Sequence, residues 1–124
     1  MAAAVLASWM RPEPPLLLSA AGAAGWLGAA GWAALVARAG SLFPGVAFRH
    51  ALDCGAAPGH ALAGVRAGLP ILVLDGAHPA WPAVAGAAAA AGVALWPARP
   101  AAIGIEGIDL RRPSGLARLR VLLA

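Results

Sequence analysis

The stretch LDCGAAPGHALAGVRAGLPILVLDG, residues 52–76, contains one complete unit of the pattern that runs through this chain. It starts at the end of an apolar run, continues through an Ala-rich segment that closes at Gly68, and reaches a second apolar run, ILVLD. A glycine just past a helix can adopt the left-handed conformation that ends it, and short apolar runs are typical of strands covered on both faces. The stretch therefore predicts a strand, a helix and a second strand.

The same punctuation recurs on both sides of this unit. ALVARAG ends at Gly40 and AAAAAG ends at Gly92, and each is followed by an apolar run. The pattern predicts alternating elements: strands at 16–20, 46–53, 71–75 and 93–96, and helices at 26–39, 58–67 and 79–91.

Strand–helix–strand units form parallel sheets with right-handed crossovers. We therefore expect an α/β protein, a small three-layer sandwich of Rossmann-like or flavodoxin-like type with a parallel sheet of about four strands. Half of a (β/α)8 barrel is the alternative, because four units could close a barrel only if two chains combined.

The 124 residues fit one domain, so we expect a single domain over 1–124. Within it, residues 1–13 are a loose N-terminus, 14–96 are the βαβαβαβ core, and 97–124 are a C-terminal extension that ends in a helix with the sequence LARLRVLLA. The sheet edges and the Leu-rich face of that helix need cover, which favours a homo-oligomer.

Charge and cysteine content limit the possible partners. The formal net charge is +4, and the arginines at 111, 112, 118 and 120 cluster near the end of the chain without interleaved aromatics. No nucleic-acid-binding motif accompanies them, so nucleic acid is not an expected partner. The single cysteine excludes an intramolecular disulfide and gives no zinc-type spacing; we expect no metal, and a reducing, cytoplasmic location.

The uncharged run at residues 14–37 is long enough to cross a bilayer. Most of it is Ala and Gly, which are only weakly hydrophobic, and its strongest apolar cluster is the triplet Leu16–Leu18. We therefore interpret it as part of a globular core, and a membrane is not an expected partner.

The polar residues of this sparse sequence gather where the predicted strands end. Ligands of open parallel sheets bind outside the carboxyl ends of the strands, so this rim is the expected place for a site. The residues placed there are Ser19, Gly22, Asp53, Cys54, Gly55, Asp75, His78, Trp96 and Arg99. With a strand order of 2-1-3-4, Asp53 and Asp75 would flank the first strand and Ser19 would lie between them.

Each candidate has a catalytic interpretation and a structural one. Cys54, just before the helix at 58–67, could be a thiolate nucleophile if His60 or His78 lay within reach, or simply a small buried side chain. Asp53 and Asp75 could act as acid and base with His78, or cap turns before glycines. The turn at Gly22 could hold a phosphate with Ser19 and Gly55, or allow close packing.

Three segments, at residues 16–25, 31–40 and 43–76, resemble a family of small uncharacterised bacterial α/β proteins that share the motifs LLSxxGAA and LDCGxAPGxALAxxRAG. The corresponding residues are LLSAAGAA at 17–24 and LDCGAAPGHALAGVRAG at 52–68, and the similarity covers most of residues 15–100. The resemblance implies a compact cytoplasmic α/β domain without an established activity. That family commonly has an acid at the place of Ala56, so this chain lacks one polar group at the rim.

Two functions follow as hypotheses. The first is a non-catalytic or weakly ligand-binding domain that acts through association as a homo-oligomer. The second is a small enzyme, or a binder of a small anionic phosphate ligand, that uses the rim around Asp53, Cys54 and Asp75. The sequence does not indicate a particular cofactor.

Overall fold

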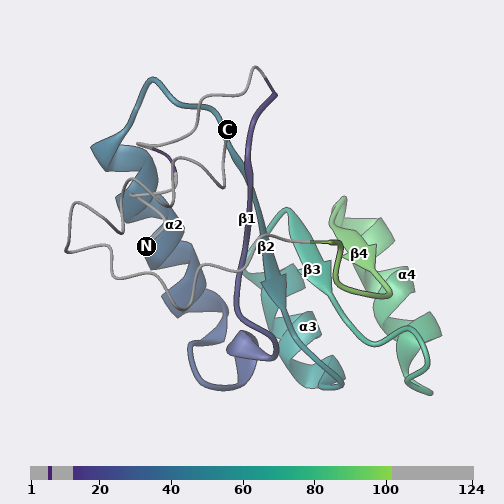
Figure 1. Cartoon of the computed structure of the whole chain (residues 1–124). Coiled ribbons are helices and arrows are strands. Elements are labelled where there is room, and N and C mark those ends of the chain that lie inside the picture. Colours follow the sequence, from purple (N-terminus) through teal and green to yellow (C-terminus); the bar gives the residue numbers. More distant parts are fainter. Residues whose placement is uncertain (1–5, 7–12, 102–124) are drawn as a thin grey trace. The chain divides into compact units, whose positions relative to one another are not determined.

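The computed structural model describes Leu6 and residues 13–101 of the chain (Figure 1). The predicted C-terminal helix and nearly all of the predicted loose N-terminus lie outside the described residues. The described elements follow the predicted alternation: β1 (Leu16–Leu18), the 3-10 helix η1 (Ala23–Gly25), α2 (Gly28–Leu42), β2 (Arg49–Asp53), α3 (Pro58–Arg66), β3 (Ile71–Val73), α4 (Trp81–Ala91) and β4 (Ala94–Trp96).

The four strands form one all-parallel sheet in the order β1-β2-β3-β4. Leu72 of β3 is the register partner of both Leu52 in β2 and Leu95 in β4. This confirms the predicted α/β class and the parallel sheet, and within the described residues the sheet does not close into a barrel. The order 2-1-3-4, considered above as one possibility, does not occur, because each of the four described strands lies next to the one that follows it in sequence.

Contacts divide the chain into two compact units. One unit comprises residues 18–34 and 50–100 and includes the carboxyl ends of all four strands. The described part of the other comprises Leu6 and residues 13–17, 35–49 and 101. The single domain expected over residues 1–124 stays a prediction.

In the first unit, α3 packs on β3, α4 packs on β4, and the two helices contact each other (Figure 1). The apolar runs behave as expected for covered strands, since Leu52, Leu72 and Leu74 are fully buried. Gly64 in α3 permits this contact, because a Cβ atom there would lie 2.6 Å from Cδ2 of Leu72. The glycine therefore sets how closely α3 approaches the sheet.

Prolines and glycines bound the helices of this unit. A proline stands in the first turn of α3 and of α4, where a missing N–H costs little. Gly92 ends α4 with a φ of 72°, and Gly68 follows α3 with a φ of 74°. Both glycines occupy the left-handed region predicted for them.

Gly40 is the exception among the three predicted helix ends. The helix α2 continues to Leu42, and the N–H of Phe43 still donates to the carbonyl of Ala39 at 3.2 Å. A Cβ atom at Gly40 would lie 3.7 Å from the ring of Phe48. That is an ordinary van der Waals distance, so Gly40 is an interior residue of the helix, and the prediction that it closes the helix was wrong.

Residues 14–37, the stretch with enough apolar length to cross a bilayer, are divided among β1, η1 and the first part of α2. Across the described part of the chain, every helix is too short or too polar to traverse a membrane.

Candidate functional site

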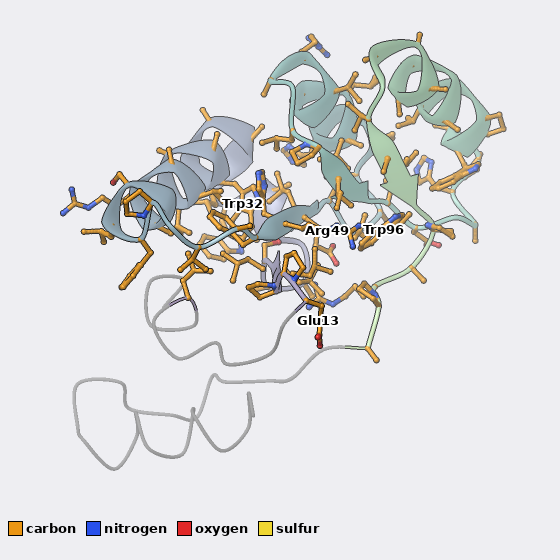
Figure 2. All side chains as sticks on the ribbon, turned by 90° about the horizontal axis from the view of Figure 1, so that it is seen from above. Glu13, Trp32, Arg49 and Trp96 are labelled. Carbon is orange, nitrogen blue, oxygen red and sulfur yellow. The ribbon has the colours of Figure 1, made fainter. Side chains whose placement is uncertain are left out.

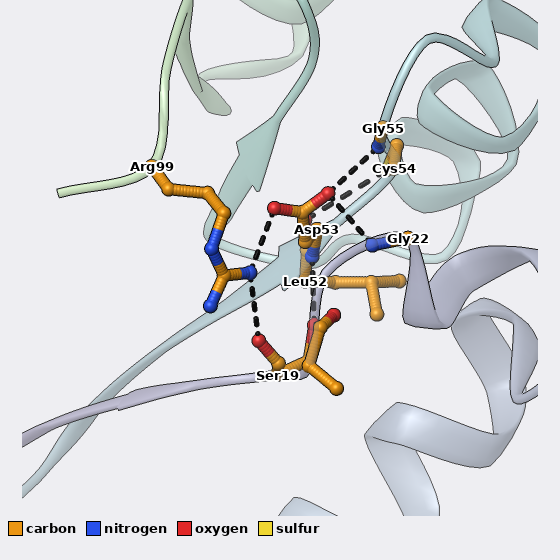
Figure 3. A network of polar contacts seen from close by, with 8 residues as sticks. Ser19, Gly22, Leu52, Asp53, Cys54, Gly55 and Arg99 are labelled. Carbon is orange, nitrogen blue, oxygen red and sulfur yellow. Dashed lines mark hydrogen bonds and ion pairs between the residues drawn. The ribbon is translucent and has the colours of Figure 1, made fainter. Parts of the chain in front are cut away.

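The carboxylate of Asp53 is the centre of a polar network at the end of β2 (Figure 3). Asp53 as a whole is only 3% exposed. Oδ1 accepts hydrogen bonds from the backbone N–H groups of Gly22, at 3.0 Å, and Gly55, at 2.7 Å. Oδ2 forms an ion pair with Nη1 of Arg99 at 2.8 Å. Both oxygens of this buried acid therefore have partners within the chain.

Ser19 joins the end of β1 to this network. Its backbone N–H donates to the carbonyl of Ala51 at 3.1 Å, which holds the ends of β1 and β2 together. Its Oγ accepts the backbone N–H of Asp53 at 2.9 Å and donates to the carbonyl of Ala20 at 3.1 Å. Its carbonyl oxygen accepts Nη1 of Arg99 at 3.0 Å. Ser19 thus fixes the backbone of Asp53, and both residues accept hydrogen bonds from Arg99.

Two glycines form the cradle that receives Oδ1. Gly22 has a φ of 65° and Gly55 a φ of 58°, both in the left-handed region that favours glycine. A Cβ atom at Gly55 would lie 3.7 Å from Cα of Gly22, so the two turns approach each other closely. The left-handed backbone conformation explains why both positions are glycine.

Cys54 lies beside Asp53 in sequence, but its thiol belongs to the core. The residue is 3% exposed, and Sγ lies 3.8 Å from the carbonyl oxygen of Leu52, to which it donates. Burial, and secondarily the charge of Asp53, raise the pKa of the Cys54 thiol to about 11. A thiolate nucleophile at the amino end of α3 would need a lowered pKa, so the raised pKa matches the alternative of a small buried side chain.

Asp75 and His78, at the end of β3, each cap their own turn. Oδ1 of Asp75 accepts the N–H of Ala77 at 3.0 Å, and Nδ1 of His78 accepts the N–H of Ala80 at 3.0 Å. Asp75 is exposed and touches the centre only through its backbone, whose N–H donates to the carbonyl of Gly55 at 2.8 Å. Their side-chain bonds match the turn-forming alternative.

The structure brings together some of the predicted rim residues and leaves out others. Among the residues described, Ser19, Gly22, Asp53 and Gly55 converge, whereas the side chains of Cys54, Asp75 and His78 bond elsewhere. The sequence places Arg99 on this rim but does not reveal its partner. The available signal was opposite charge at two strand ends, since an arginine side chain is long enough to reach from one strand end to another.

A buried tryptophan of α2 lies near a half-buried histidine of β2. Trp32 is buried, and its ring centroid lies 6.3 Å from that of His50 (Trp32 is labelled in Figure 2). Burial lowers the pKa of His50 below its ordinary value of 6.5. The sequence analysis did not single out this pair, because neither residue lies at a strand end.

The network is an intramolecular complex between a carboxylate and a guanidinium. Within residues 13–101 no group of three or more His, Cys, Asp or Glu side chains is placed to hold a metal ion. Comparison with protein-family models, curated proteins and solved structures found no match. The resemblance to the bacterial family with LDCGxAPGxALAxxRAG therefore stays a prediction.

Proposed function

We propose that this chain is a non-catalytic α/β domain that acts through association with a second copy of itself. The observation that carries the proposal is that the polar side chains of the rim are already bonded. Each predicted catalytic side chain already bonds within the chain, and the thiol of Cys54 has a pKa of about 11. A nucleophile needs the opposite arrangement, a lowered pKa and a base within reach.

Exposed apolar side chains support association as the mode of action. Trp26, which follows η1, is 71% exposed, and Leu35 and Leu42, seven residues apart on α2, are 40% and 49% exposed. Tryptophan is enriched among the side chains that dominate the binding energy of interfaces. We infer that Trp26 is an anchor of the contact between copies.

Sedimentation velocity at micromolar protein concentration tests the proposal on the full chain. We expect an associated species for the wild type. Replacing Trp26 by Ser should weaken association by about 30-fold, which corresponds to roughly 2 kcal/mol for an aromatic anchor. The matched control is Ala90→Ser, at an exposed position of α4, which should leave association unchanged. A strictly monomeric wild type contradicts the proposal.

The enzyme or phosphate-binding hypothesis remains the competing proposal. Its support is the convergence of Ser19, Gly22 and Gly55 around Asp53. However, the two N–H groups that an external phosphate would use already donate to the carboxylate of Asp53. Binding of inorganic phosphate with chemical-shift changes at the amides of Gly22 and Gly55 would favour this alternative over a purely associating domain.

A further inference from the structure

The position of the Asp53 carboxylate is fixed by contacts that do not involve Arg99. The N–H groups of Gly22 and Gly55 hold Oδ1, and Oγ of Ser19 holds the backbone N–H of Asp53. These bonds come from the ends of β1 and β2 and the turns that follow them. The backbone therefore holds Oδ2 in place as an acceptor, independently of the cation that binds it.

A cation beside Oδ2 stabilises the buried charge of Asp53. The Asp53 side chain is only 4% exposed, and a carboxylate removed from water without a partner costs several kcal/mol. The carbonyl oxygen of Ser19 lies beside Oδ2, so that one nitrogen, Nη1 of Arg99, donates to both at 3.0 Å and 2.8 Å. Two neighbouring acceptors suit the planar NH₂ group of a guanidinium, which is also less strongly hydrated than an ammonium.

The cation comes from the coil segment that follows β4. Arg99 lies in coil three residues after the end of β4, between Pro97 and Pro100, and its side chain is 37% exposed. Next to it, the carbonyl of Pro97 accepts the N–H of Gly76 at 3.0 Å. Arg99 thus reaches the site from a coil segment, whereas the residues that build the site belong to strand ends and turns.

We propose that Oδ2 of Asp53 and the carbonyl oxygen of Ser19 form a binding site for a monoalkylguanidinium, which the chain's own Arg99 fills in this structure. A ligand that carries an arginine-like group competes with Arg99 for the site. By linkage, its binding and the attachment of the segment around Arg99 oppose each other. This site goes beyond the proposed association and does not depend on it.

The test uses the full chain with Arg99→Ala, which removes the internal ligand and leaves the site. Ethylguanidinium chloride is the probe, and ethylammonium chloride at equal ionic strength is the control. We expect ethylguanidinium, and not ethylammonium, to raise the Tm of the variant saturably, with a dissociation constant on the order of 10 mM. The wild type, whose site is filled, should show a several-fold smaller rise.

Amide spectra locate the binding. Ethylguanidinium should shift the amide signals of Gly22 and Gly55 in the Arg99→Ala variant, while those of Gly68 and Gly92, which end helices elsewhere, should stay in place. Equal effects of the two salts, or shifts spread over all four glycines, would overturn the proposal.

If Arg99→Ala does not fold alone, recovery of cooperative unfolding with ethylguanidinium but not with ethylammonium supports the proposal. Arg99→Gln provides the same measurement in a variant that keeps the first carbons of the side chain and a polar end without the charge. Failure of ethylguanidinium to restore or stabilise either variant would refute the site. Because association is measured separately by sedimentation, the two proposals can fail independently.

Discussion

Arg99 and Asp53, 46 positions apart in the chain, form a 2.8 Å ion pair that connects the segment after β4 to the end of β2. The pair is asymmetric, since the Asp53 side chain is 4% exposed and that of Arg99 is 37% exposed. Removing the arginine therefore leaves a buried charge, whereas removing the acid leaves a cation that can turn to water. Loss of the partner of Asp53 should therefore lower the free energy of unfolding more than loss of the partner of Arg99.

A double-mutant cycle should measure this pair. We expect Arg99→Ala to lower the free energy of unfolding by about 1–3 kcal/mol, the cost of a buried charged group that loses a partner. In the Asp53→Asn background the same change should cost much less, because an amide does not need the cation. Chemical denaturation at fixed salt gives the values.

The control for this cycle is Arg38→Ala, which removes an exposed arginine from α2. It should change the free energy of unfolding by less than about 0.5 kcal/mol. Equal costs of Arg99→Ala with and without the Asp53 charge would mean that the pair contributes nothing beyond packing.

Cys54 should be inert at neutral pH. With a thiol pKa of about 11, roughly one molecule in three thousand carries the thiolate at pH 7.5. We expect labelling by a thiol reagent to be slow in the folded protein and to become fast when denaturant unfolds it. Fast labelling of folded protein at pH 7.5 would return Cys54 to the list of candidate nucleophiles.

The same raised pKa predicts how stability depends on alkaline pH. The folded state holds the thiol proton more tightly than the unfolded state, whose thiol has a pKa of 9.0. The contribution is therefore complete below pH 9 and is lost between pH 9 and about 11, at about 1.4 kcal/mol per pH unit. In Cys54→Ala this part of the decline should disappear when unfolding is measured across that range.

How much of this could be predicted from the sequence differs between the fold and the site. Helix boundaries were accessible because glycine and proline act locally, as at Pro58 and Gly92. Gly40 misled, because α2 continues through it to Leu42 and its φ is not positive. Strand order was not accessible either, since short apolar runs such as ILVLD carry no information about which neighbour they pair with.

At the site, position in the chain was enough to predict which residues lie at the strand ends. Which of them bond to one another depends on the tertiary fold. The consecutive strand order places Ser19 next to Asp53, and this pairing makes both side chains parts of one network. Asp53 and Asp75 look similar in sequence, because Asp75 directly precedes a glycine and Asp53 precedes one by two positions. They differ because Asp53 lies in a central strand and receives N–H groups from two turns, while Asp75 remains exposed and caps one.

His50 should make stability sensitive to mildly acidic pH. Burial lowers its pKa below 6.5, so the folded state binds the proton more weakly than the unfolded state does. Its contribution is present above pH 6.5 and is lost as the pH falls below that value. We expect His50→Gln to flatten the fall in the free energy of unfolding below pH 6.5. Ala90→Ser, at an exposed position of α4, is the control and should leave the profile unchanged.

Two glycines of α3 should respond in opposite directions to the same substitution. Gly64→Ala places a methyl group 2.6 Å from Cδ2 of the fully buried Leu72, and we expect overpacking to cost about 1–3 kcal/mol. Gly59 is exposed, has no atom within 4 Å of its Cβ position and does not have a positive φ. Gly59→Ala should therefore stabilise the protein by about 0.4–1 kcal/mol, because alanine has less backbone freedom to lose on folding. Thermal unfolding of the two variants gives both signs. If Gly64→Ala were neutral, α3 could move away from β3 at little cost, and close packing of this helix on the sheet would not explain the glycine.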